Sequence, residues 1–195
     1  MPFLLLLSNR VSKLIGNISK VFVSYPFHFL FPKKRFTIPV HSKALFKGKK
    51  QKIQKNIWQT NYSNKVSLPI YLNYLFNRLM SLSYNYHYVS TEDRLIFIKK
   101  NASNEIVKAY ERLNDGAAQA DVWRLLVLQH LGGVYIDIDA HLIYPLSGII
   151  KKSDKELLIL KGTGNAHTNY FIATEKDHPI MSSAIDIILE NINND

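Results

Sequence analysis

Two aspartates follow a short apolar stretch near the middle of the chain. Val134-Tyr135-Ile136 is β-branched and aromatic, which favours a buried strand, and Asp137 and Asp139 come directly after it. In an extended strand residues i and i+2 point to the same side, so the two carboxylates would repel unless a cation lay beside them. Oxygen-only ligands suit Mg²⁺ or Mn²⁺, which keep open positions for phosphate. The pair therefore indicates a hard divalent ion.

The segment before the aspartates predicts a helix from Ala117 to Leu131. Nothing in it breaks a helix, and its apolar residues recur near a 3.6-residue period: Val122, Leu125, Leu126, Leu128 and Leu131. Gly132 follows at the position where a left-handed C-cap favours a residue without Cβ. Asp121 and Arg124 lie one turn apart on the same face of this helix. Spacing alone does not give their role.

The helix, the glycines and the aspartates together resemble a known motif. Ala120-Asp121-x-x-Arg124 followed by Gly132-Gly133-x-Tyr135-x-Asp137-x-Asp139 is similar to the signature of the DXD sugar-transferase family. That family includes fungal initiating mannosyltransferases and bacterial capsule and lipooligosaccharide glycosyltransferases, and large clostridial glucosylating toxins share its motif. The segment 169–174 and the following His178-Pro179 also resemble this family.

The resemblance implies roles for five side chains. Asp139 would be the direct ligand of Mn²⁺ or Mg²⁺, and Asp137 would bind ribose, donor sugar or metal-bound water. Asp121 and Arg124 would bind the sugar hydroxyls and the phosphate. Tyr135 would help to form the wall of the donor pocket, or would equally be a core residue. The family is assigned a retaining outcome, and the sequence offers no clear nucleophile.

A further donor contact is expected at Trp58. The segment Ile53–Thr60 is predicted to be the first core strand and is similar to the family strand that lines the nucleotide pocket. Trp58 stands where many members have His, and in the toxin branch a Trp at the matching place stacks on the base. A core tryptophan is the alternative interpretation.

Other functions account for fewer of these residues. Asp121 and Arg124 could be a solvated helix pair, and the two aspartates could be a turn or an N-cap. A haloacid-dehalogenase-like phosphatase also has Asp-x-Asp after a strand, but it needs Thr or Val where His141 stands. A non-catalytic, membrane-associated remnant of a transferase is the third alternative.

Composition predicts a folded chain with a basic first half. The 195 residues include no Cys, which excludes disulfides and thiolate metal sites. The net charge is +10; the first 91 residues carry 14 Lys/Arg and no acid, and the remaining 104 carry 11 Lys/Arg and 15 Asp/Glu. No nucleic-acid-binding motif accompanies this charge, so we expect no nucleic-acid partner and instead an anionic membrane surface.

The N-terminal region predicts an interfacial arm. Val11 to Phe22 alternates apolar and polar residues at helical spacing, aromatic residues follow, and Lys33-Lys34-Arg35 comes next. No run reaches the ~20 apolar residues of a bilayer-spanning helix, and no convincing signal peptide is present. A helix packed on the core, with its lysines solvated, is the alternative. A mobile, lysine-rich connector at 41–55 places the boundary near residue 50, which divides the chain into a basic amphipathic arm at 1–50 and a catalytic domain at 51–195.

The rest of the chain predicts an open α/β sheet with helices on both faces and the ligand at the carboxyl edge of the strands. We expect helices at 68–82, from 91, from 103 and from Pro179, strands at 84–89 and 156–160, and a turn or mobile flap at 161–165. The resemblance implies a single Rossmann-like (GT-A type) domain that usually continues further. We therefore expect either a short or truncated member whose pocket is open on one side, or completion of the pocket by another chain. The last helix would have an uncovered isoleucine face: Ile180, Ile185, Ile188 and Ile192.

These observations predict a metal-dependent hexosyltransferase. It would move a sugar from a nucleotide-sugar donor to a glycan or glycolipid acceptor, in surface polysaccharide or lipooligosaccharide synthesis. We expect it in the cytoplasm, peripheral at the inner face of the membrane.

Overall fold

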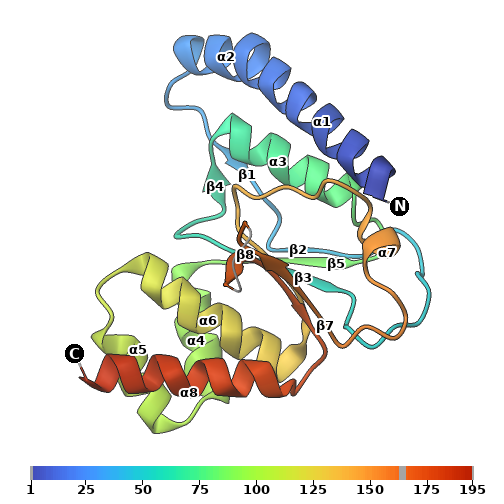
Figure 1. The fold of residues 1–195 in the computed structure, drawn as a ribbon. Coiled ribbons are helices and arrows are strands. Elements are labelled where there is room, and N and C mark those ends of the chain that lie inside the picture. The colour runs from blue at the N-terminus through green and yellow to red at the C-terminus, as the bar shows by residue number, and fades with distance from the viewer. Residues whose placement is uncertain (1, 163–165, 195) are drawn as a thin grey trace.

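The computed structural model describes residues 2–162 and 166–194, and a mixed sheet lies at the centre of this part of the chain (Figure 1). Its six strands run in the order β2-β5-β3-β6-β8-β7. They are β2 (His41–Ser42), β5 (Asn85–Val89), β3 (Asn56–Thr60), β6 (Gly133–Ile136), β8 (His167–Thr174) and β7 (Glu156–Leu160). The central strands β5, β3 and β6 are parallel, whereas β2, β8 and β7 pair antiparallel with their neighbours. A separate two-stranded ribbon joins β1 (Phe36–Thr37) and β4 (Lys65–Val66).

Helices cover both faces of this sheet, as predicted (Figure 1). On one side lie α3 (Leu68–Leu79), α1 (Pro2–Ser19), a π-helical segment (Lys20–Ser24) and α2 (Tyr25–Leu30). On the other side lie α4 (Thr91–Asn101), α5 (Asn104–Arg112), α6 (Gly116–Leu131) and α8 (Pro179–Asn194). A short helix, α7 (Leu146–Ile149), precedes β7. The chain therefore has the α/β architecture expected from its sequence.

The alternation of side chains along the strands builds two cores. Ile57, Val134 and Ile136 pack into one core together with the tyrosines of β5. Trp58 and Tyr135 point to the opposite face and pack with Trp123 of α6 and with side chains of α4, α5 and α8. Both faces of β6 are therefore buried, which explains why its sequence is apolar throughout.

The glycines after α6 set the approach of β6 to β3. Gly132 has φ 62° and Gly133 has φ 113°, in the left-handed region that favours glycine. A Cβ at Gly133 would lie 2.6 Å from the main-chain oxygen of Asn56, and one at Gly132 would meet the side chain of Gln54. At the other end of α6, the Asp115 side chain accepts hydrogen bonds from two backbone amides in the first turn. The helix predicted at 117–131 is therefore present.

The central sheet begins before the boundary predicted near residue 50. β2 pairs with β5, and Ile38 is fully buried in the core. Ile53, inside the predicted mobile connector, is also fully buried. A division at residue 50 would therefore cut through the packed body, and the arm that protrudes from it consists of α1, the π-helical segment and α2 (Figure 1).

The last helix also differs from its prediction. Ile185 of α8 is buried, and Ile188 and Ile192 pack against the core beneath α6. Three of the four isoleucines are therefore covered by α5 and α6, and the prediction of an uncovered face is wrong for them, whereas Ile180 is 37% exposed. The predicted flap at 161–165 falls partly outside the described residues, which omit 163–165.

Candidate active site

The site lies where β6 ends, at the carboxyl edge of the parallel strands. β6 stops at Ile136, and the amide of Ala140 donates to the Asp137 main-chain oxygen at 3.1 Å, which closes a turn. The main chain of Asp137 is held by the strands on both sides. Its amide donates to the main-chain oxygen of Tyr170 in β8 at 2.9 Å, and its main-chain oxygen accepts a hydrogen bond from Gln59 Nε2 of β3 at 3.0 Å. Strand alternation therefore does not determine the directions of Asp137 and Asp139, because both follow the end of the strand.

Arg124 connects the helix to the strand ends. Its side chain is 7% exposed, and its Nη2 lies 2.5 Å from Asp121 Oδ1. Its Nη1 donates to the main-chain oxygen of Asn169 at 2.7 Å and lies 3.4 Å from Asp137 Oδ1. The guanidinium also lies over the Tyr135 ring, 4.5 Å from its centroid. The buried guanidinium of Arg124 thus contacts two carboxylates and a main-chain oxygen of β8.

Tyr135 and Asp121 complete this network. The Tyr135 hydroxyl donates to Asp137 Oδ1 at 2.7 Å, and burial raises the pKa of Tyr135, so the phenol stays a proton donor. Burial also raises the pKa of Asp121, although Arg124 opposes that shift. Asn169 Nδ2 donates to Asp121 Oδ1 at 3.3 Å. The Asp121 side chain is still 42% exposed, so a ligand can reach it from solvent.

Asp139 stands apart from the network. It is exposed, and among the described residues it forms no ion pair. In the same part of the chain no three His, Asp or Glu side chains are grouped closely enough to hold a metal by themselves. A Mg²⁺ or Mn²⁺ ion commonly takes only one or two carboxylates and fills its other positions with water and substrate phosphate. The residues fit an ion held in that open manner, with Asp139 and Asp137 as the carboxylates.

Trp58 lies in the core. It is 8% exposed, its Nε1 donates to the Gly132 oxygen at 2.9 Å, and its ring stacks on His87 with centroids 4.2 Å apart. The structure thus brings together Asp121, Arg124, Tyr135 and Asp137, and places Trp58 outside that cluster. Stacking of Trp58 on a nucleotide base stays a prediction.

Two site residues were not assigned a role from the sequence. Asn169 contacts both Arg124 and Asp121, and Gln59 holds the Asp137 main chain while accepting a hydrogen bond from the Tyr86 hydroxyl. Asn169 begins the segment that resembles the family, which was a usable signal. Gln59 also lies in a segment that resembles the family, at 53–60, but the resemblance does not indicate which group its side chain contacts.

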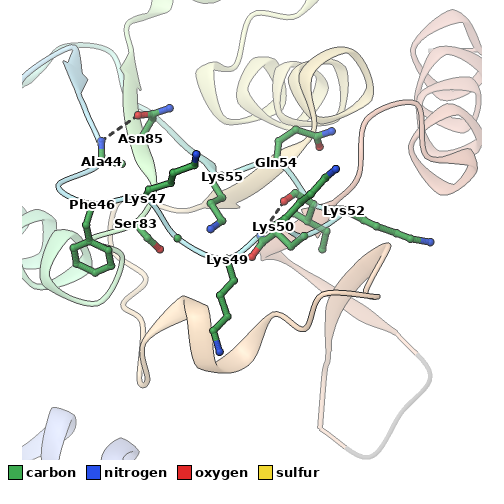
Figure 2. A pocket seen from close by; sticks show the side chains of 13 residues that line it. Ala44, Phe46, Lys47, Lys49, Lys50, Lys52, Gln54, Lys55, Ser83 and Asn85 are labelled. Carbon is green, nitrogen blue, oxygen red and sulfur yellow. Dashed lines mark hydrogen bonds between the residues drawn. The ribbon is translucent and has the colours of Figure 1, made fainter.

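A separate cavity of about 510 Å³ lies at the opposite end of β3 (Figure 2). Five lysines line it without any acidic residue: Lys47, Lys49, Lys50, Lys52 and Lys55. None of the residues of the Arg124 network contributes to its wall. The cavity is therefore distinct from the candidate active site.

The comparison with protein families matches this site. Residues 69–156 match the family described as glycosyltransferase sugar-binding region containing DXD motif. The family resemblance is confirmed. This DXD region contains Asp121, Arg124, Tyr135, Asp137 and Asp139, and it leaves Trp58 and Asn169 outside its limits.

The comparison with solved structures gives the fold. The chain is similar to the PaToxG glycosyltransferase, with a TM-score of 0.56 and 18% sequence identity, over 74% of this chain and 63% of that chain. The chain thus spans less than two thirds of that relative, and at this identity the likeness establishes a GT-A-like fold. The comparison with curated proteins gave no match. The family match and the fold together support a glycosyltransferase.

Proposed function

We propose that this chain is a metal-dependent glycosyltransferase that moves a hexose from a nucleoside-diphosphate donor to a glycan or glycolipid acceptor. The observation that carries the proposal is the Asp121–Arg124–Asp137 network at the carboxyl edge of β6, within the DXD region. Ligands bind at this edge in open α/β sheets. Surface polysaccharide or lipooligosaccharide synthesis is the process that such an acceptor suggests.

Arg124 acts in this proposal as a positioning residue. Its guanidinium is buried, and its nitrogens are engaged by Asp121, Asp137 and two main-chain oxygens. It therefore fixes the two carboxylates instead of leaving a free fork for phosphate. Asp121 is the group that meets the donor, because it is partly exposed and, within residues 2–162 and 166–194, Arg124 and Asn169 contact its Oδ1 and not its other oxygen. Its other oxygen accepts hydrogen bonds from sugar hydroxyls.

The two aspartates of the motif serve the diphosphate side of the donor. Asp139 and Asp137 would hold Mn²⁺ or Mg²⁺, which when bound stabilises the negative charge that develops on the leaving diphosphate. Asp137 Oδ1 is oriented by the Tyr135 hydroxyl and by Arg124, so its carboxylate does not need to reorganise when the donor arrives. Retention of anomeric configuration is part of the proposal.

The transferase accounts for residues that a dehalogenase-like phosphatase leaves unexplained. Those residues are Asp121, Arg124 and the glycine pair, which fall inside the DXD region. A phosphatase would hydrolyse a generic phosphomonoester and ignore nucleotide sugars. A non-catalytic remnant would do neither.

The test is a donor screen that follows nucleoside diphosphate release. The chain is incubated with a panel of nucleotide sugars and acceptors, with Mn²⁺, with Mg²⁺ and with chelator. We expect release with one donor, dependence on the metal, and loss in Asp121→Asn. Asp186→Asn, an exposed position on α8, is the matched control. The anomeric configuration of the product, determined by NMR, tests retention. Absence of release across the panel, or equal release by Asp121→Asn, would refute the proposal.

A further inference from the structure

The apolar stripe of α1 is not covered by the protein. Leu4, Leu7, Val11, Leu14 and Ile18 follow a 3-4-3-4 spacing and so share one face of the helix, and all five side chains are exposed, Leu14 by 60%. The exposed apolar surface continues beyond this helix, with Phe22 73% and Phe29 87% exposed. A helix that packs on its own domain turns such a stripe inward.

Serines occupy the side of the arm that faces the body. Ser12 and Ser24 are buried, and the Ser8 hydroxyl donates to the main-chain oxygen of Ile143. Further along, Phe27 packs against Phe36 with centroids 5.6 Å apart. Among the described residues the arm therefore contacts the body through small polar side chains and an aromatic contact, while its apolar stripe is exposed.

The charge of the arm indicates its partner. Residues 1–35 carry six Lys/Arg and no acid: Arg10, Lys13, Lys20, Lys33, Lys34 and Arg35. At about 100° per residue, Arg10 lies at the edge of the apolar stripe, and Lys13 and Lys20 lie on the far side of the helix from it. A second copy of the chain docked through the arm would bring like charges together. An anionic surface would neutralise them.

We propose that the arm docks on an anionic lipid bilayer, with Leu7, Leu14 and Ile18 inserted among the acyl chains, Arg10 at the headgroups, and Lys13 and Lys20 close enough above the surface to be attracted by its negative charge. No helix in residues 2–162 and 166–194 is long and apolar enough to cross a membrane, so the arm lies in the plane of the interface. The inference is independent of the proposed function, because it rests on burial and charge outside the DXD region and requires no nucleotide sugar.

The experiment measures binding of the full chain to vesicles, without donor or metal. Phosphatidylcholine vesicles with and without phosphatidylserine are sedimented, and the bound fraction is titrated against lipid. We expect binding to the anionic vesicles that weakens with salt. Leu14→Gln with Ile18→Gln should lower the partition coefficient by about tenfold or more, because apolar side chains drive interfacial binding. Lys13→Gln with Lys20→Gln should lower it by about fivefold for each charge.

The matched controls lie on the body. Leu79→Gln with Ile187→Gln removes two equally exposed apolar side chains, and Lys108→Gln with Lys151→Gln removes two exposed charges. We expect both controls to bind like the unchanged chain. Absence of binding to anionic vesicles, equal losses in the controls, or a stable dimer that only Leu14→Gln with Ile18→Gln dissociates would each overturn the proposal.

Discussion

Arg124 is the side chain on which the geometry of the site depends. Arg124→Lys keeps the charge, but an ammonium cannot bind Asp121, Asp137 and the Asn169 oxygen with the same fixed fork. We expect the free energy of unfolding to fall by about 2 kcal/mol, because two partly buried carboxylates and a main-chain oxygen lose their partner at a buried position. Turnover should fall with it. Urea unfolding and diphosphate release are the two measurements, and Arg112→Lys, exposed on α5, is the control. Wild-type stability in Arg124→Lys would show that the network is not structural.

Substitutions of the two motif aspartates, Asp137 and Asp139, should differ in their effect on stability. Asp139 is exposed and unpaired among the described residues, so Asp139→Asn should abolish metal-dependent turnover while leaving Tm nearly unchanged. Asp137→Asn should lower both turnover and Tm, because the Asp137 carboxylate accepts a hydrogen bond from the Tyr135 hydroxyl and lies beside Arg124. Metal-dependent turnover and Tm are measured on both variants. Full metal-dependent turnover in Asp139→Asn would remove Asp139 from the metal site.

At the scale of elements, two histidines join the edge strand β2 to β5. His41 and His87 approach with their Nδ1 atoms 3.3 Å apart, and His87 also stacks on Trp58. Burial, followed by the repulsion from His41, lowers the pKa of His87 to about 4. The unfolded chain therefore takes up this proton near pH 6.5, and the folded chain takes it up only near pH 4.

This difference predicts a loss of stability on acidification. A depressed pKa in the folded state contributes stability above the unfolded value, and that contribution is lost as the pH falls from about 6.5 to about 4. We expect about 2 kcal/mol, which is less than the full linkage value because His87 is only partly buried. Urea unfolding at several pH values should show a flatter profile for His87→Gln than for the unchanged chain, and an unaltered profile for His28→Gln on the exposed side of α2. Parallel profiles for His87→Gln and the unchanged chain would contradict the assignment.

Local sequence patterns predicted the helices and strands. They did not predict the contacts between residues that are far apart in the sequence. The 3.6-residue period and the glycine after it predicted α6, and Gly132 follows the last residue of this helix. Two hydrogen bonds of the site join residues that are distant in the sequence. Asn169 donates to Asp121, 48 positions away, and Gln59 donates to the main-chain oxygen of Asp137, 78 positions away. The same limit applies to the boundary predicted near residue 50. The basic composition of residues 1–50 suggests a solvated arm, but Ile38 within it is fully buried, and composition does not show which single apolar residue packs into the core.

At the scale of the whole molecule, charge and apolar surface are distributed unequally. The acidic residues all follow residue 91, and the uncovered apolar side chains of the arm all precede residue 32. The Arg124 network and the arm belong to different elements, and the described contacts do not link them directly. Variants of one region should therefore leave the direct assay of the other unchanged, so that vesicle binding and diphosphate release can be measured as separate properties.

The extent of the catalytic body can be tested with two deletions. Removing residues 1–32 takes away the arm, which contacts the body through serines and Phe27. Removing residues 1–50 also takes away β2 and Ile38, which is fully buried. We expect the longer deletion to cost about 3 kcal/mol more, or roughly 10 °C in Tm, because a core side chain and an edge strand are lost together. Scanning calorimetry on both proteins measures the difference. Ile38→Ala in the full chain should reproduce part of the additional loss, whereas Val40→Ala, at an exposed neighbour, should not. Equal Tm values for the two deletions would place the boundary near residue 50, as the lysine-rich sequence predicts. A lower Tm for the longer deletion alone would place residues 36–50 in the catalytic body.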